Sequence, residues 1–148
     1  MLKDRLVITS LERLLLLSNT NTHIENTLKF MISAKSAEHY TWGQGCDGWH
    51  LVRAPELSVI QERMPHGASE VRHLHSRARQ FFYVLSGRLT IELDGTRHEL
   101  GAGEGLEVPP GSAHQALNES GDDTSFIVVS QPPSHGDRLV APLIRQVT

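Results

Sequence analysis

From about residue 40 onward, the chain alternates between short runs of β-prone residues and short stretches rich in glycine, proline and aspartate. The β-prone runs are Leu57–Met64, Gln80–Leu85, Arg88–Leu93, Leu106–Val108, Ala113–Leu117 and Ser125–Ser130. Turn-forming stretches stand between them, for example at 65–67, 94–95 and 109–111. Short strands at this spacing, with turn signals between them, predict an all-β sandwich or barrel.

Two of these runs differ in their patterning. In Arg88–Leu93 the apolar residues occupy every second position, so we expect them to face the core and Thr90 and Glu92 to face water. Gln80–Leu85 is apolar on both faces apart from Gln80, which is typical of a strand that lies between two layers. Its outer face therefore needs a cover, either an N-terminal segment or a second subunit, and we expect a homodimer.

The start of the chain has a different character. We assign residues 1–39 to an N-terminal extension and linker, and residues 40–148 to a barrel domain. Thr9 and Glu12 have the spacing of a capping box, so a short helix is expected over residues 9–17. Because Met31 precedes the β-rich part, residues 1–30 are alternatively an appended extension.

Composition and charge exclude several classes of protein. The apolar run Leu14–Leu17 is too short for a signal-peptide core or a membrane span. The single cysteine, Cys46, excludes an internal disulfide and fits a reducing cytoplasm. A net charge of −3 indicates no basic surface for nucleic acids or acidic lipids. We therefore expect a cytoplasmic protein that binds neither nucleic acids nor membranes.

Three of the nine histidines stand in a pattern that indicates a metal site. His73 and His75 are two residues apart and hence share one face of a strand. Gln80 follows after a four-residue loop, and His114 stands just after a Pro-Pro-Gly turn. Imidazole nitrogens bind Zn, Fe, Ni, Mn and Cu readily, and an amide oxygen can complete the set. A His-x-His pattern alone is weak evidence, since two surface histidines would give the same spacing.

The surroundings of these residues strengthen the metal interpretation, because they resemble the two motifs of the cupin family. The first motif reads Gly67, five residues, His73-x-His75, four residues, Gln80, six residues, Gly87. The second reads Gly103, five residues, Pro109-x-Gly111, two residues, His114, three residues, Asn118. The glycines are expected at sharp turns, where φ is often positive. Asn118 is expected to be a structural hydrogen-bonding residue.

This resemblance implies a fold and a cofactor. The fold is a double-stranded β-helix, or jelly-roll barrel, preceded here by a short and helical N-terminal extension. The implied cofactor is one divalent transition metal ion, of Zn, Fe, Ni, Mn or Cu, held by His73, His75, Gln80 and His114. The implied partner is a small-molecule ligand.

The residue at position 80 departs from the family pattern, which usually has glutamate there. Three neutral imidazoles and an amide leave the full +2 charge on the metal, and such an ion polarises carbonyl and hydroxyl groups more strongly. We therefore expect Lewis-acid chemistry of the isomerase, lyase or cyclase type on an oxygenated small molecule. A metal-dependent dioxygenase and a non-catalytic small-molecule-binding protein are the alternatives.

The pocket around the metal can be predicted only in outline. Phe82 lies on the Gln80 face of its strand and is expected to form an apolar wall that contacts the ligand. Gln61 is our candidate for a polar substrate-binding group, with Glu62 as the alternative, because both alternations of that strand are plausible. Trp42 and Trp49 are expected to pack, and His135 to lie in a surface loop. The segment 134–138 is expected to close over the barrel. The sequence alone identifies no catalytic residue.

Overall fold

The computed structural model describes residues 30–142 of the chain. The helix expected over residues 9–17 lies outside the described residues. The chain divides into residues 1–32 and a compact unit of residues 33–148, and the latter contains every strand of the described part. This unit begins at Ser33 and its first strand at Glu38.

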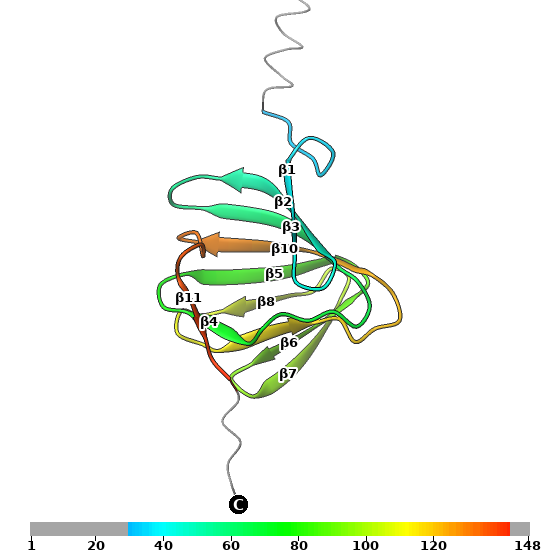
Figure 1. Ribbon diagram of the computed structural model, residues 1–148, viewed down its shortest axis with the longest axis vertical. Coiled ribbons are helices and arrows are strands. Elements are labelled where there is room, and N and C mark those ends of the chain that lie inside the picture. Colours follow the sequence, from blue (N-terminus) through cyan, green and yellow to red (C-terminus); the bar gives the residue numbers. More distant parts are fainter. Residues whose placement is uncertain (1–29, 143–148) are drawn as a thin grey trace, which may run out of the picture. The chain divides into compact units, whose positions relative to one another are not determined.

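Eleven antiparallel strands in the described residues form two facing sheets, which confirms the all-β fold (Figure 1). One sheet has the order β1-β2-β3-β10-β5-β8, and the other has the order β11-β4-β9-β6-β7. The strands are β1 (Glu38–Trp42), β2 (Cys46–Arg53), β3 (Ser58–Met64), β4 (His73–His75), β5 (Arg79–Ser86), β6 (Arg88–Leu93), β7 (Thr96–Gly101), β8 (Gly105–Val108), β9 (His114–Leu117), β10 (Thr124–Gln131) and β11 (Arg138–Val140).

The six strand runs expected from the sequence all form strands, namely β3, β5, β6, β8, β9 and β10, and their ends agree to within one residue. Strands β1, β2, β7 and β11 were not expected. Strand β7 carries mostly polar, exposed residues, and β2 is interrupted in the sequence by Gly48, so neither shows a strong apolar alternation.

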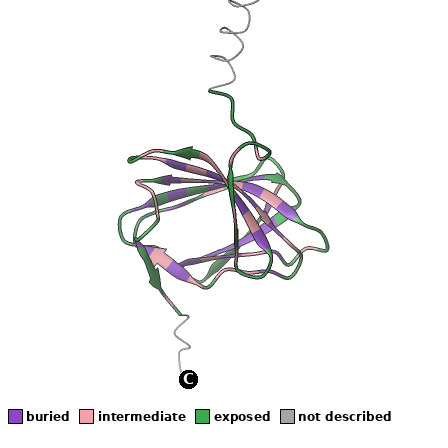
Figure 2. Cartoon of the chain, turned by 45° about the horizontal axis from the view of Figure 1, so that its top comes forward, coloured by how far each residue is buried: buried purple, intermediate pink, exposed green. Residues whose placement is uncertain are grey.

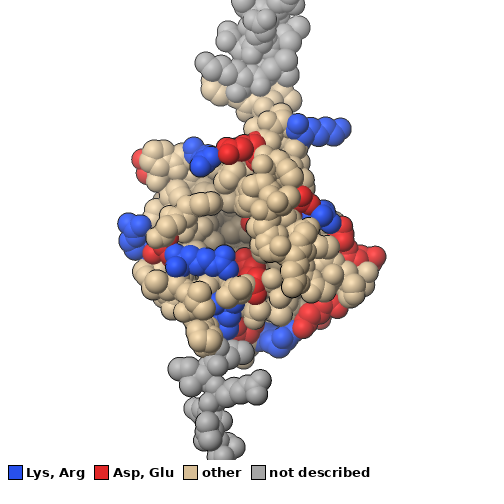
Figure 3. All heavy atoms as spheres, in the orientation of Figure 1, with Lys and Arg blue, Asp and Glu red and all other residues tan. Residues whose placement is uncertain are grey.

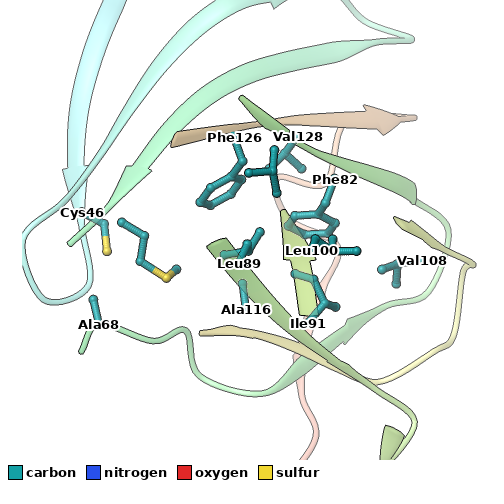
Figure 4. Packing of buried hydrophobic residues seen from close by; sticks show 12 residues of the cluster. Cys46, Ala68, Phe82, Leu89, Ile91, Leu100, Val108, Ala116, Phe126 and Val128 are labelled. Carbon is teal, nitrogen blue, oxygen red and sulfur yellow. The ribbon is translucent and has the colours of Figure 1, made fainter. Parts of the chain in front are cut away.

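The core lies between the two sheets. Burial alternates along β3, β5 and β10, so that one face of each strand lines the interior (Figure 2). Figure 4 shows Phe82, Leu89 and Phe126 pointing into this space. Such a core removes apolar surface from water and provides the main stabilisation of the fold.

Strand β6 departs from the expected alternation, because Thr90 and Glu92 are buried rather than facing water. Glu92 is stabilised inside by Arg72, whose Nε donates to a carboxylate oxygen at 2.6 Å. The backbone N–H of Gly95 donates to the other oxygen. A buried charge is tolerated when it is paired and hydrogen-bonded, and here the partner comes from outside the strand.

Strand β5 is covered on one face only. Gln80, Phe82 and Val84 are buried, whereas Phe81, Tyr83 and Leu85 are 42%, 39% and 43% exposed. The described residues therefore supply no second layer over this face of the strand.

The expected turns are present. Gly67, Gly87, Gly103 and Gly111 all have φ between +78° and +85°. The requirement is strictest at Gly87, where a Cβ would lie 2.6 Å from the backbone oxygen of Asp123. Asn118 is buried and its amide donates to the carbonyls of Met64 and Asp122, both at 2.8 Å, as expected for a structural residue.

Within residues 30–142, no helix is long and apolar enough to cross a membrane.

Candidate metal centre

Three histidines meet on the inner face of the smaller sheet. His73 and His75 lie on β4, and Leu74 between them points the opposite way, as the strand alternation requires. His114 begins β9 and is the direct cross-strand partner of His73. All three side chains are buried, and each offers a ring nitrogen within 4.8 Å of the other two. They are the one such group found among the described residues.

Each imidazole is oriented through its Nδ1 by a backbone carbonyl. The acceptors are the carbonyl of Val71 for His73 at 2.8 Å, that of Asp137 for His75 at 2.8 Å, and that of Ser112 for His114 at 3.1 Å. A carbonyl can only accept, so in each ring Nδ1 carries the hydrogen. This tautomer leaves a bare lone pair on Nε2, the form in which imidazole binds metals.

The bare nitrogens converge on one another. Nε2 of His73 lies 3.2 Å from Nε2 of His75, and Nε2 of His114 lies 3.0 Å from Oε1 of Gln80. These atoms direct their lone pairs at one another, and a cation bound between them stabilises such an arrangement. Protons do not supply that cation near neutral pH, because burial lowers the pKa of all three histidines, that of His73 to about 3. The donor set therefore fits a metal ion.

Gln80 presents its oxygen to this group. The side chain lies on the inner face of β5 and is buried. Its Nε2 donates to Oγ of Ser130 on β10 at 3.1 Å, and this contact turns Oε1 toward His114. This is the orientation that an amide ligand needs, since only the oxygen can bind a cation.

Asp137 joins the metal centre to the C-terminal segment. Its backbone carbonyl orients His75, and its carboxylate accepts the N–H groups of Ser76, Arg77 and Ala78 at 3.1, 2.8 and 2.9 Å. These hydrogen bonds lower the pKa of the Asp137 carboxyl. The segment 134–138 thus closes against the barrel beside the histidines, as expected from the sequence.

A cavity of about 270 Å³ opens next to the histidines. Figure 3 shows a hollow near the centre of the face that is turned toward the viewer. The cavity wall combines apolar side chains with polar groups that reach in from several strands. Its lining is formed by Tyr40, Trp42, Ile60, Glu62, Glu70, His73, His75, Gln80, Phe82, Val128, Ser130, Ser134, His135, Gly136 and Arg138.

Of the two residues expected in the pocket, Phe82 and Gln61, only Phe82 lies on the cavity wall. Phe82 lies on the cavity wall, where a contact with a ligand remains our prediction. Gln61 does not line the cavity; its amide lies on the other face of β3, 3.5 Å from Oγ of Ser125. Glu62, the alternative, is on the cavity side, because β3 buries Ile60, Glu62 and Met64. Of the two alternatives, Glu62 rather than Gln61 therefore lies on the cavity wall, and its contact with a ligand stays a prediction.

Several cavity residues were not expected to be near the site. Trp42 and Tyr40 reach it from β1, and Arg138 from β11. His135 is an exposed residue of the turn before β11, as expected from the sequence, and it also lines the cavity; its ring centroid is 6.0 Å from that of His50. Trp42 Nε1 is buried without a hydrogen-bond partner among the described residues.

Two carboxyl groups share the cavity wall. Glu62 accepts a hydrogen bond from the hydroxyl of Tyr40 at 3.2 Å, and Glu70 accepts one from the backbone N–H of Ala116 at 3.2 Å. Burial and the neighbouring Glu70 raise the pKa of Glu62 to about 8. Burial likewise raises the pKa of Glu70. A group with a pKa near neutrality can both donate and accept a proton.

Comparison with known proteins supports the architecture. The model of the family described as "Cupin domain" matches residues 60–130, a range that contains all three histidines and Gln80. An uncharacterized protein of Methanocaldococcus jannaschii is 26% identical over 89 residues, which is 60% of this chain and 71% of that protein.

Two further similarities involve proteins with described activities. The polyketide synthase CurC of Streptomyces cyaneus is 36% identical over 61 residues, and the match spans 41% of this chain but only 39% of that protein. The structure of the polyketide cyclase RemF of Streptomyces resistomycificus superposes with a TM-score of 0.67 at 18% identity, covering 78% of this chain and 87% of RemF. At this level of identity the superposition shows a shared fold.

Proposed function

The chain belongs to the cupin family, and on that premise we propose that it is an enzyme that uses one divalent transition metal ion as a Lewis acid. The ligands are His73, His75, His114 and Gln80. The proposed reaction is an isomerisation, elimination or cyclisation of an oxygenated small molecule. The name of the Streptomyces cyaneus relative, a polyketide synthase, supports a ketone-bearing substrate class.

The observation that carries this proposal is the orientation of the donors. Three Nδ1 atoms are held on backbone carbonyls while three Nε2 atoms and the Gln80 oxygen point at one another. Such orientation by outer hydrogen bonds is typical of metal-binding imidazoles. Three nitrogens and one oxygen suit Zn, Fe, Ni, Mn or Cu, and elemental analysis of the purified protein identifies which is bound.

The charge of the ligand set favours Lewis-acid chemistry. All four donors are neutral, because burial keeps the histidines unprotonated and Gln80 is an amide. A bound metal would keep its full charge, which supplies strong polarisation of a carbonyl or hydroxyl oxygen. The substrate whose oxygen the metal polarises would lie between Phe82, Val128 and Trp42, which line the cavity.

The Gln80→Glu variant tests the role of the neutral amide. A carboxylate at this position adds a negative charge beside the ion, so we expect metal affinity to rise by about tenfold, as for a charge-assisted contact worth 1 to 2 kcal/mol. Competition with a chromophoric chelator measures this affinity. Gln61→Glu makes the same chemical change on the outer face of β3 and should leave affinity unchanged. Equal affinities in Gln80→Glu and the wild type would contradict a ligand role for Gln80.

The same samples separate the alternative functions. Metal-loaded wild type is mixed with candidate sugars, keto acids and phenols while product and dissolved oxygen are followed. Product formation without oxygen uptake supports the proposal. Substrate-dependent oxygen uptake would identify a dioxygenase instead, and binding without turnover would identify a non-catalytic binding protein.

We also propose that the protein is a homodimer that buries the outer face of β5. Phe81, Tyr83 and Leu85 form an exposed apolar row there, and the side chains of Ile127 and Val129 on β10 lie directly beside it. A contiguous apolar sheet face of this kind is typical of an interaction surface. Light scattering should give twice the chain mass, and Tyr83→Lys should give a monomer. Val140→Lys, at an exposed apolar residue on β11, is the control. A monomeric wild type at tens of micromolar would contradict this assembly.

A further inference from the structure

Three residues lie in a row across β1, β2 and β3. Tyr40 is the cross-strand partner of Gly48, and Gly48 is the partner of Glu62. A Cβ at Gly48 would lie only 2.3 Å from the ring of Tyr40, so the ring occupies the space that a side chain at position 48 would take. This close packing lets the Tyr40 hydroxyl reach over β2 and donate to Oε1 of Glu62 at 3.2 Å.

This contact holds one oxygen of Glu62 and leaves the other available. Among the described residues, no second donor lies within hydrogen-bond distance of the Glu62 carboxyl. The residue is 9% exposed, and it lines the cavity together with His73, His75 and Gln80. A carboxyl group that served only the packing of the sheet would be expected to have both oxygens satisfied.

The surroundings of Glu62 suit proton exchange. The charged or titratable groups that face it are Tyr40 on β1, Cys46 on β2, Glu70 in the loop before β4, and Arg138 on β11. Burial and Glu70 favour the protonated form, whereas the hydroxyl of Tyr40 and the charge of Arg138 favour the ionised form. These opposing influences keep both forms of the carboxyl accessible near neutral pH.

We propose that Glu62 is the group that exchanges a proton with the ligand in the cavity, and that Tyr40, seated over Gly48, positions it. This inference rests on the proposed Lewis-acid function and adds the missing acid–base group to it. The substrate class is then a hydroxy-ketone or hydroxy-aldehyde, because its carbonyl oxygen can be polarised while a neighbouring C–H bond is broken.

The proposed step needs no oxidant or reductant. The ionised Glu62 takes a proton from the carbon next to the carbonyl; that C–H bond breaks, an O–H bond forms on Glu62, and the electron pair passes into the enolate. The hydroxyl proton of this enediolate then passes to the former carbonyl oxygen, and return of a proton from Glu62 to the former carbonyl carbon completes an isomerisation. The proton held on Glu62 exchanges with solvent before it returns, so the reaction carries deuterium into the product in D2O. Atoms and electrons balance, and Glu62 ends in its starting form.

The test uses dihydroxyacetone as a probe in D2O, with loss of its C–H signal followed by proton NMR. Metal-loaded wild type should exchange these protons faster than metal-free protein. Glu62→Gln keeps the size of the side chain but cannot take up a proton, so exchange should fall by about 100-fold, within the usual contribution of general acid–base catalysis. Gln61→Ala, at the neighbouring residue on the outer face, should exchange at the wild-type rate.

Positioning by Tyr40 is tested separately from activity. In metal-free protein labelled with 13C-glutamate, the Glu62 carboxyl signal is identified by its absence in Glu62→Gln and titrated. Tyr40→Phe removes a donor to the ionised form, so the pKa of Glu62 should rise, and the pH profile of exchange should move upward with it. Exchange at a fixed pH should fall by about tenfold, and Gly48→Ala, which displaces the tyrosine ring, should behave in the same way.

Each outcome decides the proposal. Wild-type exchange in Glu62→Gln would overturn it, and so would a loaded wild type that exchanges no faster than metal-free protein. An unchanged Glu62 pKa in Tyr40→Phe would overturn the positioning role. Metal stoichiometry, measured on the same samples, reports on the proposed function alone: loaded protein without exchange refutes only the proton-transfer step, whereas failure to load refutes the metal centre itself.

Discussion

Replacing His75 with alanine should abolish stoichiometric metal binding while the barrel stays folded. The imidazole is one of the four proposed donors, and structural metal sites with four ligands bind with roughly 10 to 16 kcal/mol, or about 3 kcal/mol per ligand. The loss of one donor therefore weakens binding by about 100-fold. The ring of His75 is held only by the Asp137 carbonyl on its far side, so its removal leaves the strand pairing of β4 intact. Elemental analysis after dialysis measures the loss.

A matched control is His98→Ala on β7, which removes a histidine far from the cavity lining and should keep the full metal content. Circular dichroism establishes that both variants are folded. Equal metal content in His75→Ala and the wild type would show that the three histidines do not hold the ion.

Replacing Arg72 with methionine should destabilise the fold by about 3 kcal/mol, because it leaves the buried carboxylate of Glu92 without its partner. Arg72 donates to both oxygens of Glu92, at 2.6 and 3.1 Å, and also to the carbonyl of Ala141 at 2.7 Å. Urea unfolding of the metal-free protein at pH 7 measures the free energy of unfolding.

The dependence on pH distinguishes a buried charge from simple loss of packing. Arg72 lowers the pKa of Glu92, so the pair contributes stability above the ordinary pKa of glutamate and loses it as the pH falls toward the lowered value. The difference between wild type and Arg72→Met should therefore shrink in acid. The double variant Arg72→Met, Glu92→Met should recover most of the loss. Arg97→Ala, at an exposed ion pair with Glu119, should cost less than 1 kcal/mol. A pH-independent difference would contradict an electrostatic origin.

The fold was predictable because its signals are local. Turn glycines and short apolar runs located six strands to within one residue, and the motif spacing indicated the cupin barrel. Glu92 shows where local reasoning fails: its burial depends on Arg72, twenty positions earlier in the chain, and no alternation rule contains that pairing. Likewise, strand β7 is exposed and polar, so its place in the sheet comes from its pairing with β6.

The candidate site was predictable in its histidines but not in its wall. Because His73 and His75 are two residues apart, they share one face of a strand, whatever the rest of the fold is. The choice between Gln61 and Glu62 required the register of β3 against β2 and β10, which the composition of β3 leaves open. Tyr40 was missed because its role depends on the absence of a side chain at Gly48, a cross-strand relationship. Trp42 packs partly buried against the core, as expected, but its place on the cavity wall depends on the pairing of β1 with β2.

The anchoring of His75 by Asp137 has a consequence for when the ion is acquired. The residue that orients this ligand is synthesised 62 positions after it. A nascent chain on the ribosome therefore cannot hold the imidazole in its binding orientation until Asp137 has emerged and β11 has paired with β4. Because related metals differ in affinity in a fixed order, the occupant of such a site depends on which ions are available. If these residues hold an ion as proposed, the ion available once Asp137 is in place would occupy the site, and expression in a host with a different metal supply should yield the same barrel carrying a different ion.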